Sequence, residues 1–496
     1  MLAAVSYASA SYCLSHGYTL YYGDAEAHLN IARRVVDSRT PGAEQLGTVW
    51  LPLPHVLMLP FVRKADLWET GLAGVFPSAA AFILGGLAMF AAARRAFESR
   101  WAGLSVVLVY ASNPNLLYLQ SIPMTESLLL ASLAALLWTT LWYRDTKSIW
   151  ALVAAAAASN AASLTRYEGW FVIPFVFGYL LLVADRKWHC LIFGALASLG
   201  PIFWLAHNQY YYSNALEFVN GPYSAVAIYK RQLAQGMAPY PGDHDWLKAI
   251  QYYATASRLV IGVPMLLFGG IGTAISLYRR IFWPVLFLLL APVFYVWSMH
   301  SSGTPIFVPS LWPFSWYNTR YAIPVLLWAA MAAGALVAAV PAKYRIAGAL
   351  TLGLIPAGCY LAFTPGPLFF SGSICWKESQ VNSAARREWT LQAAQYLSIY
   401  YRPTDRIAIS FGDLAGVLRL AGIPLRRALH EGNHPQWDSV MAQPGKFLSE
   451  DWVLAFAGDS LAAGTLAADR QGVHYQLRKQ IMVKGAPVVE IYHREP

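Results

Sequence analysis

Long apolar runs dominate this chain of 496 residues and limit it to a membrane-spanning fold. A transmembrane helix needs about 20 mainly apolar residues, and a composition of 57% hydrophobic and only 12% charged residues excludes an ordinary soluble domain. We read eleven runs as spans, at about 2–18, 71–93, 101–119, 127–143, 149–164, 169–184, 190–207, 259–278, 281–299, 321–340 and 346–363. The pattern predicts a mainly α, polytopic membrane protein of about 11 transmembrane helices.

Basic residues gather in alternate connections between these runs. Lys and Arg favour cytoplasmic loops, so the pattern predicts an inner (plasma) membrane protein of bacterial type, with the N-terminus inside and the intervening loops and C-terminus on the extracytoplasmic side. The net charge of +10 is then explained by topology and anionic membrane lipids, and no nucleic acid partner is expected. The connections carry Arg94, Arg95 and Arg100; Arg144 and Lys147; Arg186 and Lys187; Arg279 and Arg280; and Lys343 and Arg345.

The chain changes character near residue 371, where the apolar runs stop. Helical patterns at 384–400 and 414–421 alternate with strand-like stretches at 406–410, 452–456, 475–478 and 488–493. We expect a transmembrane domain at 1–370, with an extracytoplasmic first loop at 19–50, and a soluble extracytoplasmic α/β domain at 371–496. Asp413, His430 and His434 are read as ordinary loop-end residues, and the four distant cysteines suggest neither disulfides nor zinc.

The first loop places two carboxylates, Asp24 and Glu26, directly after an apolar run. Acidic groups at a membrane edge are costly unless they are solvated, paired or used, so the pair is a candidate functional site. The alternative is that Asp24 only caps a helix over about 25–36, with Glu26 in its first turn. An apolar stripe predicts that this helix lies on the membrane surface, and the proline-rich run 50–61 is expected to lie in the interface rather than to cross.

Three other loops on the same side carry charged residues. Glu126 begins the fourth span, where Thr125 and Glu126 could simply cap the helix. Arg166 is followed closely by Glu168, and the two could neutralise each other. Arg320 lies in the aromatic stretch 317–321, where it fits either a headgroup anchor or a phosphate ligand.

The order of these features resembles the GT-C superfamily of membrane glycosyltransferases, in its protein O-mannosyltransferase and lipid A aminoarabinose transferase branch (glycosyltransferase family 39-like). The resemblance covers about the first 145 residues well, the later spans by topology, and the C-terminal domain hardly at all. The features that carry it are the Asp24-x-Glu26 loop, the proline-rich run, Val75-Phe76-Pro77-Ser78-Ala79, Arg94-Arg95, Ser112-Asn113-Pro114 and Met124-Thr125-Glu126-Ser127-Leu128-Leu129.

The resemblance implies an inverting enzyme that moves a sugar, mannose-like or another hexose or pentose, from a polyprenyl-phosphate donor. The acceptor would be an extracytoplasmic hydroxyl of a protein, lipid or glycan. The family's acidic residues map onto Asp24, Glu26 and Glu126. In aminoarabinose transferases a Lys precedes the paired prolines and meets the donor phosphate, whereas here Trp50-Leu51-Pro52-Leu53-Pro54 holds no base. Phosphate binding must therefore fall to other cations.

The chemistry of glycosyl transfer suggests a role for each residue. Asp24 suits a general base for the acceptor proton, and Arg320 and Arg166 suit the charge that grows on the leaving phosphate. Glu26 and Glu126 complete the catalytic set and could orient Asp24 or the acceptor, and the supporting residues are His28, His55, Tyr317 and Tyr321. No cofactor or metal is expected, although a divalent ion at Asp24 and Glu26 with the histidines stays an alternative.

Two other functions compete with this one. A polyprenyl-linked sugar transporter or flippase would explain the spans without catalysis, but such proteins often show internal repeats, and none is found here. An oligosaccharyltransferase with a diphosphate-linked donor is disfavoured because the family's Trp-Trp-Asp signature is absent from the soluble domain.

Overall fold

A computed structural model of the protein describes residues 1–362 and 373–495, with the side chains of 359–362 left out, and it divides the chain into two compact units. The helical unit comprises Met1–His16, Thr48–Pro54 and Pro77–Glu378. The α/β unit comprises Gly17–Gly47, His55–Phe76 and Ser379–Pro496. The first loop thus belongs to the same unit as the C-terminal residues.

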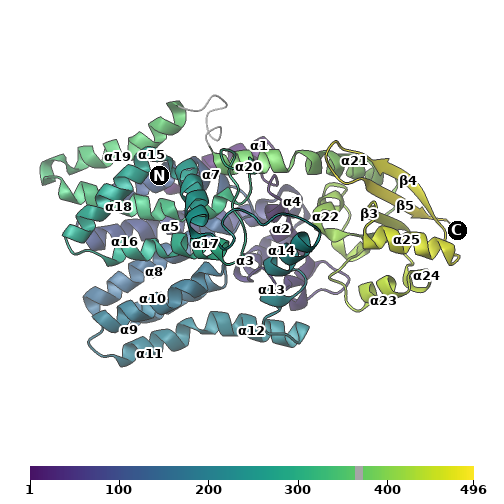
Figure 1. The fold of residues 1–496 in the computed structure, drawn as a ribbon, viewed down its shortest axis with the longest axis horizontal. Helices are drawn as coiled ribbons and strands as arrows, with labels where there is room; N and C mark the ends of the chain where they lie inside the picture. Colours follow the sequence, from purple (N-terminus) through teal and green to yellow (C-terminus); the bar gives the residue numbers. More distant parts are fainter. Residues whose placement is uncertain (363–372, 496) are drawn as a thin grey trace. The chain divides into compact units, whose positions relative to one another are not determined.

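Long helices of the helical unit run side by side (Figure 1). Each predicted apolar run forms one helix or two consecutive helices, which confirms the mainly α membrane fold. Among residues 1–362 and 373–495, six segments are long and apolar enough to cross a membrane, and three more helices are apolar but shorter, so the number of eleven spans stays a prediction. The helices are α1 (Leu2–Ser15), α5 (Leu72–Phe97), α6 (Arg100–Ser112), α7 (Pro114–Leu119), α8 (Glu126–Thr146), α9 (Ile149–Ser163), α10 (Glu168–Val183), α11 (Trp188–Ala197), α12 (Leu199–Tyr212), α13 (Glu217–Asn220), α14 (Ala225–Ala234), α15 (Trp246–Tyr278), α16 (Trp283–Leu288), α17 (Leu290–His300), α18 (Val325–Ala339), α19 (Arg345–Ala362) and α20 (Ile374–Asn382), with short 3-10 turns η2 (Thr319–Ala322) and η3 (Ala342–Tyr344).

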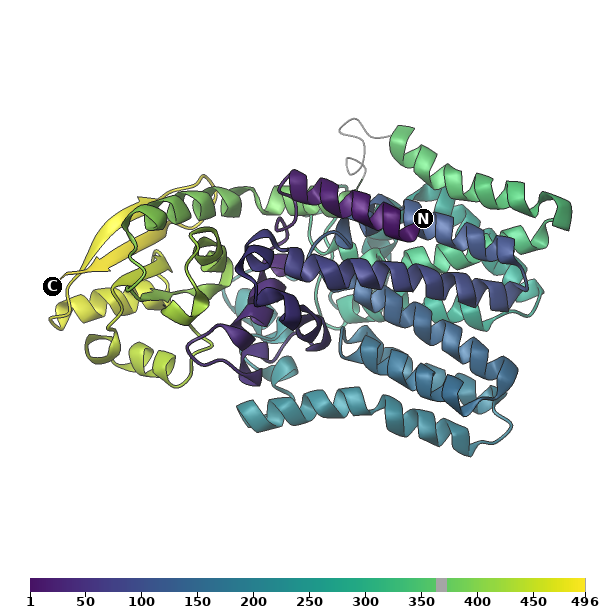
Figure 2. The same ribbon diagram turned by 180° about the vertical axis from the view of Figure 1, so that it is seen from behind.

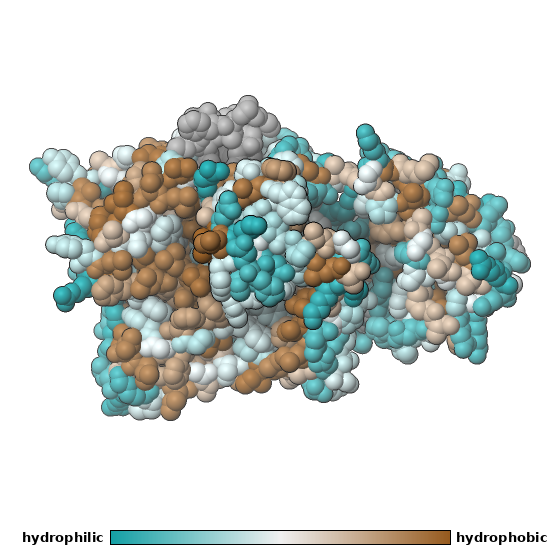
Figure 3. Space-filling model, in the orientation of Figure 1, coloured by the Kyte–Doolittle hydropathy of each residue, from teal (hydrophilic) through white to brown (hydrophobic). Residues whose placement is uncertain are grey.

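The surface of this unit suits a lipid environment. Figure 3 shows hydrophobic side chains spread over its helices. Large apolar residues on several helices are exposed, among them Leu84, Leu182 and Leu354. An apolar surface of this extent is typical of contact with membrane rather than water.

Helix α15 is kinked, and the backbone carbonyl that loses its helical hydrogen bond at the kink accepts hydrogen bonds from side chains outside the helix. Gly262 has φ 78°, and Pro264 lacks the N–H that would bond to the Val260 carbonyl one turn earlier. Asn113 and Asn115 donate to that carbonyl instead, at 2.8 and 2.9 Å. The Ser112-Asn113-Pro114 segment therefore has a structural use, because the Asn113 side chain also caps α7.

The basic connections lie at one end of the helical unit. Arg95 pairs with Asp145 at 2.9 Å, which joins the α5–α6 and α8–α9 connections. Lys147 donates to the Val183 carbonyl at 2.6 Å, and Arg279 donates to the Ala338 carbonyl at 3.3 Å. The alternation read from the sequence is thus present in the arrangement of the helices.

The α/β unit is built on a five-stranded sheet of order β2-β1-β3-β5-β4. Its C-terminal strands are the yellow arrows near the C-terminus in Figure 2. Strand β1 pairs in parallel with β2 and β3, and β5 pairs antiparallel with β3 and β4. The strands are β1 (Ile407–Ile409), β2 (Ala428–Leu429), β3 (Trp452–Phe456), β4 (Tyr475–Ile481) and β5 (Val489–Arg494). The C-terminal helices are α21 (Ala384–Tyr400), α22 (Phe411–Leu420), α23 (Gln436–Ala442), α24 (Pro444–Phe447) and α25 (Ser460–Arg470), with the short turn η4 (Leu425–Arg427).

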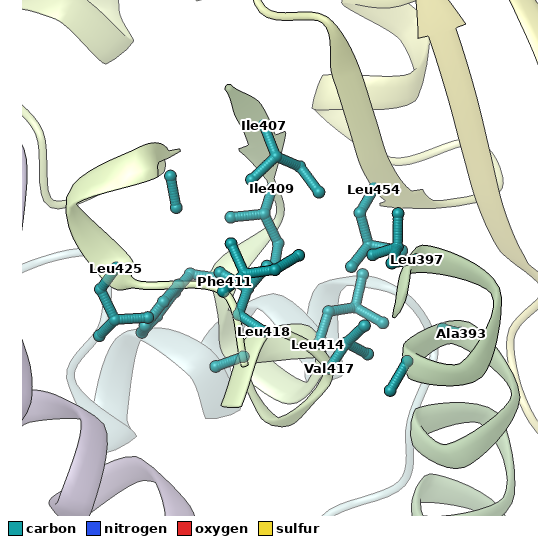
Figure 4. Packing of buried hydrophobic residues seen from close by; sticks show 14 of the residues in the cluster. Ala393, Leu397, Ile407, Ile409, Phe411, Leu414, Val417, Leu418, Leu425 and Leu454 are labelled. Atoms are coloured by element: carbon teal, nitrogen blue, oxygen red, sulfur yellow. The ribbon is translucent and has the colours of Figure 1, made fainter. Parts of the chain in front are cut away.

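Alternation along the strands gives the sheet two apolar faces. Ile407 and Ile409 pack into one buried cluster, which holds residues of α21 and α22, and Ala408 packs into another, which holds residues of α23 and α25. Figure 4 shows the first cluster, with Leu414 and Leu418 of α22 beside the strands. The helices therefore cover both faces, as expected for an α/β layer. The sequence prediction missed β2, α23, α24 and α25.

The first loop completes the first of these clusters. It forms α2 (Gly23–Val36) and η1 (Ala43–Leu46), and α3 (Leu53–Val62) and α4 (Ala65–Thr70) follow it in the chain. Leu29 and Ala32 of α2 are fully buried in the cluster with Leu414 and Val417. The expectation that α2 lies on the membrane surface is wrong, because its apolar stripe is covered by protein.

Candidate functional site

A buried ion-pair network occupies the helical unit at the start of α8. Glu126 is the first residue of α8, Arg166 lies two residues before α10, and Arg320 lies in η2. Oε1 of Glu126 accepts from Nη1 of Arg166 at 3.4 Å and from Nε of Arg320 at 3.1 Å. Glu126 and Arg320 are nearly fully buried. The structure therefore brings together three predicted site residues that are far apart in the sequence.

Two further carboxylates join this network. Glu168 accepts from Nε of Arg166 at 2.8 Å, which confirms the neutralising pair considered from the sequence. Glu378 of α20 accepts from Nη1 of Arg320 at 3.4 Å and from the Thr319 hydroxyl at 2.6 Å. Sequence reasoning missed Glu378, because no pattern links α20 to the loop before α18.

Aromatic rings surround the two guanidinium groups. The Tyr321 ring lies 4.8 Å from the guanidinium carbon of Arg166 and 5.0 Å from that of Arg320. Tyr295 stacks on Tyr321 with ring centroids 4.9 Å apart, and its hydroxyl donates to Glu168. Tyr321 is thus placed as predicted, Tyr295 was missed, and Tyr317 is instead exposed and paired with Phe307 through a β-bridge.

The charges of the network nearly cancel. Two guanidinium groups face Glu126, Glu168 and Glu378. Burial raises the pKa of Glu378, against Arg320 and the N–H donors of Thr319 and Asn318, which lower it. All three guanidinium nitrogens of Arg166 donate hydrogen bonds. Nε donates to Glu168, Nη1 donates to Thr125 and Glu126, and Nη2 donates to the hydroxyl of Tyr295. Arg166 therefore acts as a structural centre of the network.

The remaining predicted residues lie in the α/β unit. Helix α2 begins at Gly23 after Tyr22, so Asp24 lies within the first turn and is not the N-cap. Its side chain is half-buried. The capping alternative is therefore wrong in detail, although a carboxylate in the first turn still interacts favourably with the helix dipole.

Glu26 is held by two arginines of the C-terminal helices. Its carboxylate pairs with Arg386 of α21 and with Arg419 of α22, each at 2.8 Å. Arg386 also donates to the carbonyls of Leu20 and Tyr21. Glu26 therefore fixes the start of α2 against the C-terminal helices, which is a positioning role.

His28 and His55 form a buried pair beside this point. Nδ1 of His28 lies 2.9 Å from Nε2 of His55, so one ring donates to the other. Both rings are buried. Across residues 1–362 and 373–495, no group of three or more His, Cys, Asp or Glu side chains is arranged to hold a metal ion. The described cysteines Cys13, Cys190 and Cys375 are buried thiols, and the side chain of Cys359 lies outside the description.

Helices long and apolar enough to cross a membrane, a buried acid–arginine network and a small α/β unit define a mainly α, polytopic membrane protein. Residues 67–207 match the family model of dolichyl-phosphate-mannose-protein mannosyltransferases. A search of curated proteins gives no match.

Two solved structures, of one protein in two states, have a similar fold. The chain is similar to ArnT from Cupriavidus metallidurans bound to undecaprenyl phosphate, with a TM-score of 0.57, 14% identity and coverage of 97% of each chain. The apo state of the same protein matches with a TM-score of 0.53 and 14% identity, and the match covers 94% of this chain and 93% of that chain. An oligosaccharyltransferase from Archaeoglobus fulgidus gives 0.44 with 13% identity, covering 87% of this chain and 64% of that one.

Proposed function

We propose that the protein is a glycosyltransferase that takes a sugar from a polyprenyl phosphate and transfers it, with inversion, to a hydroxyl of an extracytoplasmic acceptor. The buried network of Glu126, Arg166 and Arg320 carries the proposal, because ionisable groups at the ends of membrane helices are retained where they are used. The fold supports it, since the similar ArnT structure holds undecaprenyl phosphate.

Arg320 is our candidate for the donor phosphate. A guanidinium group offers planar paired donors to a phosphate, and leaving-group charge in a site closed to water is stabilised strongly by such donors. Glu126 and Glu378 hold this guanidinium in place before the ligand arrives. A phosphate at Arg320 would compete with Glu378, and burial already raises the pKa of that carboxyl, which favours its neutral form.

Asp24 is our candidate for the general base. It is a half-buried carboxylate in the first turn of α2, and its neighbour Glu26 is engaged by two arginines. A positioned carboxylate that accepts the acceptor proton is worth about 10² to 10⁴ in rate. We place Asp24 on the extracytoplasmic side, because its loop follows the first apolar run and the Lys- and Arg-rich connections alternate with the loops of its side along the sequence.

The direct test is a transfer assay on the purified protein in nanodiscs. A panel of polyprenyl-phosphate-linked sugars is offered with protein, lipid and glycan acceptors, and both released polyprenyl phosphate and the anomeric configuration of the product are measured. We expect one donor to be cleaved and the product to be inverted.

A translocation assay with the same donors serves as the control. It follows a labelled lipid-linked sugar across a sealed vesicle without cleavage. Translocation without release of polyprenyl phosphate by any donor would contradict the proposal and favour a flippase.

A further inference from the structure

An arginine-rich cleft lies wholly within the α/β unit, and neither the fold nor the proposed reaction accounts for it. It consists of two adjoining cavities with volumes of about 380 and 640 Å³. These volumes fall in the range of small-molecule sites, roughly 300–1,000 Å³. The smaller cavity is lined by Ser38, Arg39, Arg406, Arg426, Arg427 and Gln436, and the larger by Arg33, Val35, Val36, Asp37, Ser38, Pro41, Arg63 and Arg426.

Every residue that lines the smaller cavity is polar, and none is a carboxylate. Four guanidinium groups share a space of this size, and like charges held close together lower the stability of the fold unless an anion joins them. An apolar ligand would gain little there. The lining therefore favours a compact, multiply charged anion.

Some of this charge is already balanced by protein groups. Arg39 pairs with Glu450 at 2.7 Å, and Arg426 pairs with Asp37 at 3.0 Å while its side chain stays 63% exposed. Arg33 also pairs with Asp37, at 2.7 Å. These carboxylates thus hold the guanidinium groups of Arg33, Arg39 and Arg426 in fixed positions.

The excess charge rests on other arginines. Nη1 of Arg427 has only a carbonyl partner, Thr404, at 3.4 Å. The side chains of Arg406 and Arg63 are exposed and have no hydrogen-bond or ion-pair partner among residues 1–362 and 373–495. Two nearby carboxylates, Asp405 and Asp451, accept from the backbone N–H groups of Arg402 and Arg406. The cleft therefore keeps a positive surplus.

Distant parts of the chain build the cleft with a defined geometry. Arg39 lies in the first loop, and Arg427 lies in the C-terminal part of the chain. Nη2 of Arg39 donates to the backbone carbonyl of Arg427 at 3.2 Å. The cleft exists only when these segments fold together. A loose set of surface arginines would not show such mutual support.

We propose that this cleft is a binding site for a phosphate group. Phosphate monoesters carry about −1.5 to −2 charges and three acceptor oxygens, and several guanidinium groups can bind one such group with paired donors. The phosphate can belong to the headgroup of a membrane lipid or to a soluble phosphate ester. The site is separate from Arg320 and does not depend on the proposed transfer reaction.

The test compares a cleft variant with a charge-matched control on the full chain. Arg406→Gln combined with Arg427→Gln removes two cleft charges, and Arg470→Gln combined with Lys479→Gln removes two exposed charges elsewhere on the same unit. Binding of inorganic pyrophosphate to the detergent-purified proteins is measured by calorimetry. In parallel, spin-labelled phosphatidic acid is titrated into neutral nanodiscs holding each protein, and its immobilisation is measured.

We expect at least about tenfold weaker binding for the cleft variant, because hydrogen bonds between charged groups are lost, and little change for the control. Weaker binding of pyrophosphate by the cleft variant identifies the ligand as a soluble phosphate ester. Weaker binding of phosphatidic acid alone identifies it as a lipid headgroup. Thermal unfolding of both variants shows whether they are folded. Equal weakening by the two variants, or no binding of either probe by the unmodified protein at millimolar concentration, would overturn the proposal.

Discussion

Asp24 is the residue on which the chemical proposal rests, and its place in α2 defines a clean substitution. Because Asp24 lies in the first turn and not at the N-cap, Asp24→Asn keeps the size of the side chain and loses the helix-dipole interaction, worth about 0.3–1 kcal/mol. We expect the protein to fold and to bind donor while sugar transfer falls by about 10² or more. The measurement is transfer rate beside thermal unfolding.

Glu44→Gln, an exchange in the nearby η1 turn, is the matched control for this substitution. It should leave the rate unchanged. Transfer at the unmodified rate by Asp24→Asn would show that the base lies elsewhere.

Arg320 and Arg166 are predicted to differ, although both lie beside Tyr321. Arg320→Lys should raise the KM for the donor about tenfold or more with a modest loss of stability, because an ammonium group cannot reproduce the planar pair of donors. Arg166→Lys should mainly lower the unfolding temperature, since it breaks contacts with Glu168, Thr125 and Tyr295. Steady-state kinetics and thermal unfolding distinguish these two effects. A raised KM in Arg166→Lys together with a lowered unfolding temperature in Arg320→Lys would assign the phosphate-binding role to Arg166.

His430 is predicted to make the α/β unit sensitive to acid. Burial, with Arg34, Arg39 and His434 nearby, lowers the pKa of His430 well below its usual 6.5. The folded state keeps the ring neutral while the unfolded chain takes up a proton below about 6.5. The contribution of His430 to stability is therefore full above pH 6.5 and falls as the pH drops, with a slope of up to about 1.4 kcal/mol per pH unit.

Unfolding of the full chain measured between pH 5 and 8 checks this slope. His430→Asn keeps an acceptor for the Gly432 N–H and should flatten the slope, whereas the exposed His474→Asn should not. Glu431, whose pKa burial raises, acts with the opposite sign because its contribution is lost as the pH rises above about 4.5. An unchanged slope in His430→Asn would assign the acid sensitivity to another group.

At the scale of elements, the contact between α2 and the C-terminal helices depends on Glu26. Gly416 of α22 allows the close approach, since a Cβ there would lie 2.6 Å from Oε1 of Glu26. Glu26→Gln would leave Arg386 and Arg419 without their counter-charge in a partly buried place. We expect a loss of about 3 kcal/mol or more in unfolding free energy, measured by denaturant titration.

The exposed Glu69→Gln is the control, because Glu69 contacts Arg419 only through its backbone carbonyl. Its stability should match that of the unmodified protein. A Glu26→Gln protein of normal stability that has lost transfer would instead indicate a direct role in the reaction.

The sequence predicts elements better than partners. Local periodicity is enough for α21 and β3, whose predicted bounds match those observed, and composition is enough for the apolar helices. The partners of Glu26 lie some 360 and 393 residues away, and Glu378 lies 252 residues from Glu126 in the sequence. No local pattern reports such contacts. The place of α2 was misjudged for the same reason, because an apolar stripe fits a membrane surface and a protein core equally well.

At the scale of the whole molecule, the sidedness of the chain is open to a labelling test. Cys375 is a poor reporter because it is fully buried. Lys479→Cys in the α/β unit and Arg280→Cys in a basic connection are both exposed. We expect a membrane-impermeant maleimide to label Lys479→Cys from the extracytoplasmic side and Arg280→Cys only after the membrane is opened. The opposite labelling would invert the topology.

The core of the α/β unit also sets the order in which the protein can mature. Leu29 and Ala32 are made early, yet helix α22, which packs against α2, and the strands β1, β3 and β5 of the same cluster are made much later. Domains usually fold as units during synthesis, but here the first loop must wait, uncovered, until α22 and the sheet have been made. Emergence of these later segments, rather than of the first loop itself, therefore decides when this unit becomes native, and a chain stopped before β3 would expose that loop to aggregation or proteolysis.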